Sequence, residues 1–139
     1  MKKFLMLLLL SLALTGCGGE ESKVGDRAET FIREMISGDA NKAAEMVVPP
    51  EKMPEAMKGL FQEKLTAMFK AMQGAIKDRG SLKSVKAKEV KFENGDKTAA
   101  LVTLEVVVHD AKKDREETKQ NQMHMVKKDG NWFIDDLKK

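Results

Sequence analysis

The sequence is short of the residues that usually build reactive or stacking sites. It has no tyrosine, one tryptophan (Trp132), one cysteine (Cys17) and two histidines in 139 residues. One cysteine and two histidines are too few for the four-ligand sites that hold structural zinc, and the scarcity of aromatic rings disfavours a sugar-stacking surface. No glycine-rich loop joins an expected strand to an expected helix, which argues against a nucleotide site. Neither a metal nor a cofactor is therefore predicted.

An excess of charge of one sign is also missing. The chain carries 25 Lys and Arg residues against 22 Asp and Glu residues. Without Lys2 and Lys3, which belong to the leader described next, the net charge is about +1. Because proteins that bind nucleic acid usually show a clear basic excess, nucleic acid is not an expected partner.

The N-terminus contains one short apolar run, Phe4 to Leu14, behind Lys2 and Lys3. As a helix this run would be about 16 Å long, whereas the apolar core of a bilayer is about 30 Å thick. Two lysines, a short leucine-rich segment and a junction of small residues are typical of a secretory signal peptide. Residues 1–16 are therefore predicted to be removed on export.

The junction ends in the only cysteine and reads Leu14-Thr15-Gly16-Cys17. It resembles the lipobox of bacterial lipoproteins. This resemblance implies that the Cys17 sulfur carries a diacylglycerol, that the chain is cut before Cys17 and that the new amine is acylated. Two or more acyl chains hold a protein durably on a membrane. The alternative is an ordinary cleaved signal with a stray thiol, which suits an oxidising compartment poorly.

The residue after Cys17 bears on where such a lipoprotein would reside. In Gram-negative lipoproteins an aspartate here tends to retain the protein at the inner membrane, and this chain has Gly18. The resemblance therefore implies the outer membrane, facing the periplasm, if the source is Gram-negative. Residues 17–23 are expected to form the lipidated cysteine and a polar tether that reaches about 20 Å, and residues 24–139 a single domain.

The first half of the predicted domain has the periodicity of helices. Apolar residues three and four apart predict a first helix over residues 28–36, which Gly38 would end. Asp39 can cap a second helix from Ala40 to about Val47, which Pro49 and Pro50 would stop. A third helix is predicted from Glu55 to Lys77, with Gly59 and Gly74 as weak points. Its methionines, Met68 and Met72 among them, are expected either to fill gaps in the core or to line a ligand pocket or partner groove.

The second half alternates with a period of two and predicts antiparallel strands. A change of parity after Ala87 requires a bulge near Lys88 and Glu89. The segment AALVTLEVVVHD, residues 99–110, has apolar residues at every even position from 100 to 108 and is predicted to be the central strand. Helices followed by strands are the pattern of an α+β fold.

The pair Asp129-Gly130 predicts a tight hairpin, which fixes the register of the last two strands. Met123, Met125, Trp132 and Ile134 then share one face, which is expected to be the core. On the opposite, polar face, His124 lies beside Asp135, and His109 lies near Glu105. The face turned to the helices is expected to offer hydrophobic residues and methionines but no acid or base.

Three stretches in this order, FIREMISGDANKAAEMV, NGDKTAALVTLEV and KKDGNWFID, resemble the nuclear transport factor 2-like (NTF2-like, cystatin-like) fold. More closely, they resemble small bacterial lipoproteins of this fold that are grouped as a domain of unknown function. The resemblance implies three N-terminal helices packed on a curved antiparallel sheet of about four strands, in the form of a cone. It also implies frequent dimerisation through the sheet, but no single activity, because the scaffold carries isomerases, dehydratases and binding modules.

The sharpest catalytic candidates are His124 and Asp135, since a carboxylate can orient an imidazole as a general base. Their position on the polar face favours a surface ion pair instead. The segment QMHM also suggests a copper site, but alternation sends Met123 and Met125 to one side of the strand and His124 to the other.

The sequence thus predicts a membrane-anchored periplasmic binding module for a small apolar ligand or an envelope protein. The weak candidates for ligand contact are Met68, Met72, Met123, Met125 and Trp132. One alternative is a small isomerase-, dehydratase- or hydrolase-like enzyme that uses His124 or Asp135. Another alternative is a purely structural homodimer.

Overall fold

The computed structural model describes residues 2–135, with side chains from Gly19 onward. Three helices, α1 (Lys2–Ser37), α2 (Ala40–Glu45) and α3 (Glu55–Arg79), precede four strands. The strands are β1 (Gly80–Phe92), β2 (Ala99–Asp110), β3 (Arg115–Lys128) and β4 (Asn131–Ile134). They form one antiparallel sheet in the order β1-β2-β3-β4. The expected α+β class, with helices and a four-stranded antiparallel sheet, is confirmed.

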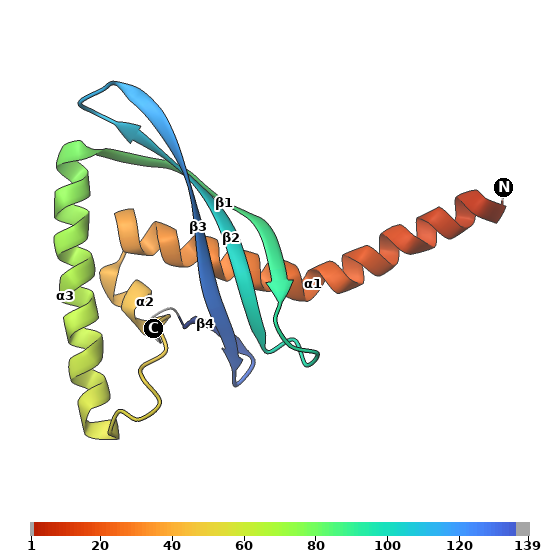
Figure 1. Ribbon diagram of the computed structural model, residues 1–139, viewed down its shortest axis with the longest axis horizontal. Helices are drawn as coiled ribbons and strands as arrows, with labels where there is room; N and C mark the ends of the chain where they lie inside the picture. The colour runs from red at the N-terminus through yellow and green to blue at the C-terminus, as the bar shows by residue number, and fades with distance from the viewer. Residues whose placement is uncertain (1, 136–139) are drawn as a thin grey trace.

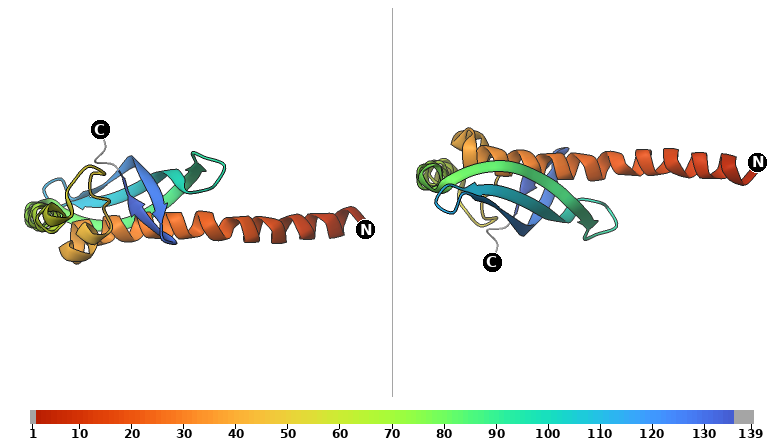
Figure 2. Two further views of the ribbon diagram at one scale, coloured as in Figure 1. Left: turned by 90° about the horizontal axis from the view of Figure 1, so that it is seen from below. Right: turned by 90° about the horizontal axis from the view of Figure 1, so that it is seen from above.

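The elements form a curved sheet with α1 lying across it (Figure 1). Helix α3 stands beside the C-terminal end of α1, roughly at right angles to it, and α2 fills the corner between them (Figure 1). The sheet bends along the length of its strands (Figure 2). Since α3 packs mainly on α2 and α1 and touches the sheet chiefly at β1, it leaves part of the face turned to the helices uncovered.

Helix α1 is longer than the sequence predicts. It runs without interruption from Lys2 to Ser37, so the stretch Gly18 to Lys23, expected to be a tether, is helical. Its reach falls from the expected 20 Å to about 9 Å, because a helix rises only 1.5 Å per residue. One physical reason is Glu20, whose carboxylate accepts hydrogen bonds from Lys127 Nζ at 2.8 Å and Trp132 Nε1 at 3.0 Å. Within the part of the chain that the structure describes, no helix has the length and apolar character needed to cross a membrane. The Cys17 side chain lies outside the described residues.

The two other helices lie close to their predicted positions. The Asp39 carboxylate accepts a hydrogen bond from the Asn41 backbone N–H at 2.9 Å and caps α2, as predicted. Helix α2 ends at Glu45, two residues before the expected end. Helix α3 extends two residues beyond its predicted end and continues through Gly59 and Gly74. The Gln73 amide joins α3 to α1 by donating to the backbone carbonyls of Glu34 and Met35 at 2.9 and 3.1 Å.

The register of the sheet agrees with the alternation in the sequence. Strand β2 is central, and its even residues from Ala100 to Val106 are buried. The predicted bulge is a register shift between Ala87 and Glu89, and a second shift lies near Leu82. Asp129 and Gly130 both have positive φ, 52° and 82°, as a two-residue primed hairpin requires. The pairing of β3 with β4 that this turn implies is also confirmed.

The hydrophobic core lies between the helices and the face of the sheet that carries the even residues of β2. Helices α1 and α2 and one side of α3 contribute to it. Its buried residues begin at Val24 and end at Ile134, and Leu104, Met125, Val24 and Val102 are its largest fully buried side chains. The aromatic rings of Phe31 and Phe69 meet edge to face at 5.9 Å. Residues 19–139 contain all of these core residues, and we expect this segment to fold by itself.

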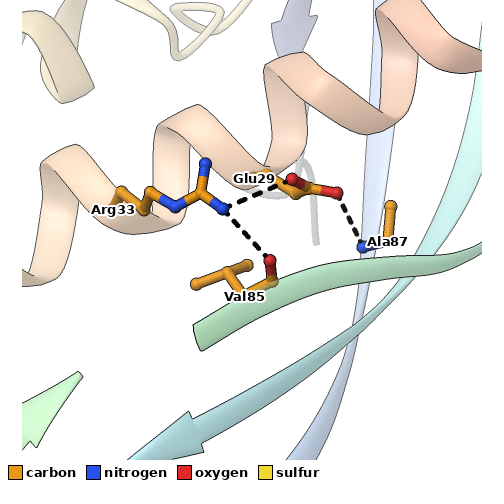
Figure 3. Close-up of polar contacts among 4 residues, drawn as sticks. All are labelled: Glu29, Arg33, Val85 and Ala87. Carbon is orange, nitrogen blue, oxygen red and sulfur yellow. Dashed lines mark hydrogen bonds and ion pairs between the residues drawn. The ribbon is translucent and has the colours of Figure 1, made fainter. Parts of the chain in front are cut away.

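Two polar side chains of α1 fasten it to β1 beside the bulge (Figure 3). Glu29 Oε2 accepts a hydrogen bond from the Ala87 backbone N–H at 3.0 Å. Arg33 Nη2 donates to the Val85 carbonyl oxygen at 3.3 Å and lies 3.5 Å from Glu29 Oε1. Helix α1 thus satisfies backbone groups of the strand at the point where its register shifts.

Candidate ligand-binding groove

An apolar cavity of about 330 Å³ lies where α1, α3 and β3 meet. The side chains that line it include Phe31, Met35, Leu65, Met68, Met123 and Ile134. Met123 at the floor is only 5% exposed, whereas Met68 on α3 is 49% exposed. The cavity therefore has a closed apolar floor and an open rim.

A second cavity, of about 390 Å³, adjoins the first toward the far end of β3. Its apolar wall includes Ile36, Ile76 and Val108, and its charged lining includes Arg79, Glu117 and Lys119. Asn121 lines both cavities. We call the two cavities together the groove, with an apolar end at Met123 and a charged end at Lys119.

The groove owes its position to the alternation of β3. Glu117, Lys119, Asn121 and Met123 pair with the apolar even residues of β2, from Val108 to Val102, so they project from the same face of the sheet. At the end near the β3–β4 turn, β4 extends the sheet and α1 packs on this face. At the other end α3 stands away from β3, and the face stays accessible.

The carboxylates at the charged end are already engaged. Glu117 lies 3.6 Å from Lys113 Nζ and 3.7 Å from Arg115 Nη2. The Asp110 carboxylate accepts from the backbone N–H groups of Lys113 at 3.2 Å and Lys112 at 2.9 Å. These hydrogen bonds, that from Lys113 foremost, lower the pKa of Asp110 by stabilising its ionised form.

The cations of the groove, in contrast, form no ion pair with any side chain that the structure describes. Within residues 19–135, no carboxylate oxygen lies within 4.0 Å of the Arg79 guanidinium or the Lys119 ammonium. Gly80 allows the end of α3 to lie close against β2, because a Cβ at this position would overlap the His109 carbonyl oxygen. Arg79 is thereby held at the rim, beside the start of β1.

The candidates named from the sequence occupy different places. Met68 and Met123 come together in the apolar end of the groove, and Met72 packs on the edge of the core. Met125 is fully buried and Trp132 is 3% exposed. Both belong to the core around β4, and neither lines the groove.

The candidate catalytic pair lies outside the groove. The Asp135 backbone N–H donates to the His124 carbonyl oxygen at 2.9 Å, as the expected register requires. The His124 ring, however, has its Nδ1 3.0 Å from Glu93 Oε1. In the other candidate pair, His109 Nε2 lies 3.4 Å from Asp114 Oδ1, whereas Glu105 is near Lys88.

Sequence reasoning missed the charged end of the groove. The expectation that the helix-facing side of the sheet offers no acid or base is wrong, since Glu117 and Lys119 project from it. The signal was present in the sequence, because Lys119 has the same parity in β3 as Met123 and Met125. A lysine on a strand's core-facing parity, flanked by polar residues, indicates that the core ends there. Among the described side chains, no three His, Cys, Asp or Glu residues are placed to share a metal ion.

Comparison with solved structures adds independent information on the fold. The chain is similar to the crystal structure of a protein from Campylobacter jejuni described as an NTF2-like transpeptidase, with a TM-score of 0.59 and 20% identity. The similarity covers 78% of this chain and 94% of that one. The chain has an NTF2-like fold.

Two other solved structures have lower structural similarity to this chain. A designed NTF2 protein has a TM-score of 0.48, with 20% identity over 76% of this chain and 86% of its own. A protein from Psychrobacter arcticus that contains a SEC-C motif has a TM-score of 0.49, with 12% identity over 80% of this chain and 59% of its own. No protein-family description matches the sequence, and no curated protein matches it.

Proposed function

We propose that this protein is a lipid-anchored binding module of the cell envelope that takes an apolar ligand into the groove. The observation that carries the proposal is the apolar cavity of about 330 Å³ under an exposed methionine rim. Cavities of this size, lined mostly by apolar side chains, are typical of sites for small molecules. In this proposal the curved sheet and the three helices act as the cone whose open side admits the ligand.

The proposed anchor is a lipid on Cys17. It is supported by the residues Leu14 to Cys17, which end an apolar run too short to span a bilayer. Among the described side chains, from Gly19 onward, the first core residue is Val24. Residues 1–16 would be the signal peptide, residues 17–23 the lipidated cysteine with its link, and residues 24–139 the binding domain. The proposed site is the outer membrane facing the periplasm if the source is Gram-negative.

The anchor is tested by expressing the full chain in bacteria fed with radioactive palmitate. The native chain should incorporate label and fractionate with membranes, whereas Cys17→Ser should lose both properties. Thr15→Ser, which leaves the cysteine in place, is the matched control and should remain labelled. A native chain that is exported but unlabelled would contradict the anchor.

The ligand is tested by native mass spectrometry of residues 19–139 purified from a bacterial periplasm. We expect an excess mass that is lost on denaturation, and we expect Met68→Glu to reduce its occupancy because a charge on the rim is costly beside an apolar ligand. Lys70→Glu, on an exposed side of α3, should retain the ligand. A clean apo mass for the native protein would count against a tightly held small molecule.

A second candidate, docking of an envelope protein, rests on a different observation. Met57 and Leu60 on α3 are 48% and 47% exposed, and exposed apolar residues that gather on one helix can mark a protein-binding surface. Met57→Glu with Leu60→Glu should then disrupt a complex without emptying the groove. Catalysis by His124 and Asp135 gains no support, because neither residue lines the groove. The homodimer is tested by sedimentation of residues 19–139.

A further inference from the structure

The two ends of the groove differ in a way that narrows the chemical class of ligand. One end is apolar, from Phe31 to Met123, and the other holds the cations Arg79 and Lys119. We propose, building on the proposed function, that the groove binds a single-chain amphipathic anion, a long-chain fatty acid. The acyl chain would lie in the apolar end and the carboxylate between Arg79 and Lys119.

The length of the groove suits an extended chain. Its floor follows β3 from Met123 to Glu117, and these six steps along a strand span about 20 Å. A compact ring system would fill one cavity and leave the other empty. An unbranched chain that starts beside Met123 and passes Asn121 contacts both, and each buried methylene adds to its affinity.

The charges of the groove select an anion at the far end. The acids there already have partners, Glu117 in Lys113 and Arg115, and Asp110 in backbone N–H groups. Arg79 and Lys119, which line this end, have no carboxylate oxygen within 4.0 Å among residues 19–135. A carboxylate between them would receive charge-assisted hydrogen bonds, which are stronger than neutral ones.

Because both cations are exposed, the affinity for the ligand depends on its acyl chain. An ion pair in contact with water is weak by itself, so a short carboxylate such as acetate should bind poorly. The acyl chain supplies most of the affinity and the two cations supply the preference for an acid over a neutral lipid. This division gives the proposal a direct test, because the two contributions can be removed separately.

The test uses residues 19–139 and the fluorescent fatty acid cis-parinaric acid, titrated beside the matched alcohol, in which CH₂OH replaces the carboxylate. The native protein should bind the acid about tenfold more tightly than the alcohol, the discrimination expected of a hydrogen bond to a charged group. The double variant Arg79→Gln/Lys119→Gln should lose this preference and bind the alcohol as before. Lys70→Gln/Lys77→Gln, which removes two cations that do not line the groove, should keep it.

A third variant addresses the apolar end. Met68→Glu should weaken binding of the acid and of the alcohol alike, and circular dichroism should show that all the variants remain folded. If the native protein binds both lipids equally, or if Arg79→Gln/Lys119→Gln keeps the preference, the carboxylate assignment is overturned while the apolar groove of the proposed function stands. If neither lipid binds, this inference is overturned, and a clean apo mass in the native experiment would then overturn the ligand proposal too.

Discussion

The two halves of β3 lie in contrasting environments. Near the β3–β4 hairpin, Met123 and Met125 are buried, and the neighbouring Trp132 packs on Phe92 with ring centroids 6.2 Å apart. We call this the closed end of the sheet. At the other half, the open end, Lys119 and Asn121 project from the same face but are exposed.

The difference between the ends comes from what covers them. At the closed end, β4 extends the sheet and α1 lies over it, and Arg27 Nε donates to the Trp132 carbonyl oxygen at 3.0 Å. At the open end, α3 packs against α1 and α2 and leaves β3 accessible. Stability should therefore be concentrated at the closed end and local mobility at the open end, a division that binding proteins often show.

The largest expected effect compares the same substitution at a fully buried methionine and at a half-exposed methionine on the rim of the groove. Met125→Ala at the closed end should lower the free energy of unfolding by about 2–5 kcal/mol, because it opens a cavity around a fully buried side chain. Met68→Ala at the half-exposed rim should cost less than about 1 kcal/mol. Urea unfolding of residues 19–139 measures both, and equal losses would remove the contrast.

The next effect concerns the fastening of α1 beside the bulge. Glu29→Ala should cost about 1–3 kcal/mol, because it removes the acceptor of the Ala87 N–H and leaves a partly buried donor unsatisfied. Glu29→Gln retains an acceptor oxygen and is the matched control, with an expected loss less than half as large. A Gln variant as unstable as the Ala variant would show that the hydrogen bond to Ala87 is not the cause.

A smaller effect is expected where α3 is joined to α1. Gln73→Leu removes the amide that donates to the carbonyls of Glu34, Met35 and Gly38, at a cost of about 1 kcal/mol since these carbonyls can be reached by water. Hydrogen exchange should accelerate in α3 and remain unchanged in β2. Uniform acceleration in both elements would mean that α3 does not unfold separately from the sheet.

The smallest effect is a dependence on pH at the closed end. Hydrogen bonds from Lys127 and Trp132 lower the pKa of Glu20 below its ordinary value of 4.5. A lowered pKa in the folded state stabilises the protein above the unfolded pKa, and this contribution is lost as the pH falls through the folded pKa. The advantage of the native protein over Glu20→Gln, measured by thermal unfolding from pH 7 to pH 3, should therefore disappear in acid. An advantage that does not vary with pH would contradict this assignment.

The sequence predicted the parts of the fold that are determined locally. Asp129 and Gly130 determine the last hairpin because both adopt positive φ, and the parity change after Ala87 predicts the bulge. The length of α1 was not predicted, because the contacts of Glu20 with Lys127 and Trp132 join residues more than 100 positions apart.

The candidate site was predicted only in part, for a similar reason. Helical periodicity identifies an apolar stripe on α3, but it does not say which of its residues the sheet covers. Alternation likewise identifies the core-facing side of β3 and β4 but does not say where the groove opens. The ligand candidates therefore combine Met68 and Met123, which line the groove, with Met125 and Trp132, which belong to the core. Arg79 and Lys119 line one cavity because α3 ends beside the end of β2, where the Arg79 carbonyl accepts a hydrogen bond from the Ala111 N–H.

The unequal lengths of β3 and β4 also bear on how the protein behaves at high concentration. Strand β4 pairs with only the last few residues of β3, and the His124 carbonyl, which bonds to Asp135, marks which backbone groups of β3 point to that side. By alternation, those of Glu116, Thr118, Gln120 and Gln122 point the same way, and no described strand pairs with them. An open strand edge invites aggregation, and proteins commonly guard against it with charged side chains. The stretch REETKQNQ, residues 115–122, contains no apolar side chain, so an edge that could start a fibril is kept soluble by its own composition.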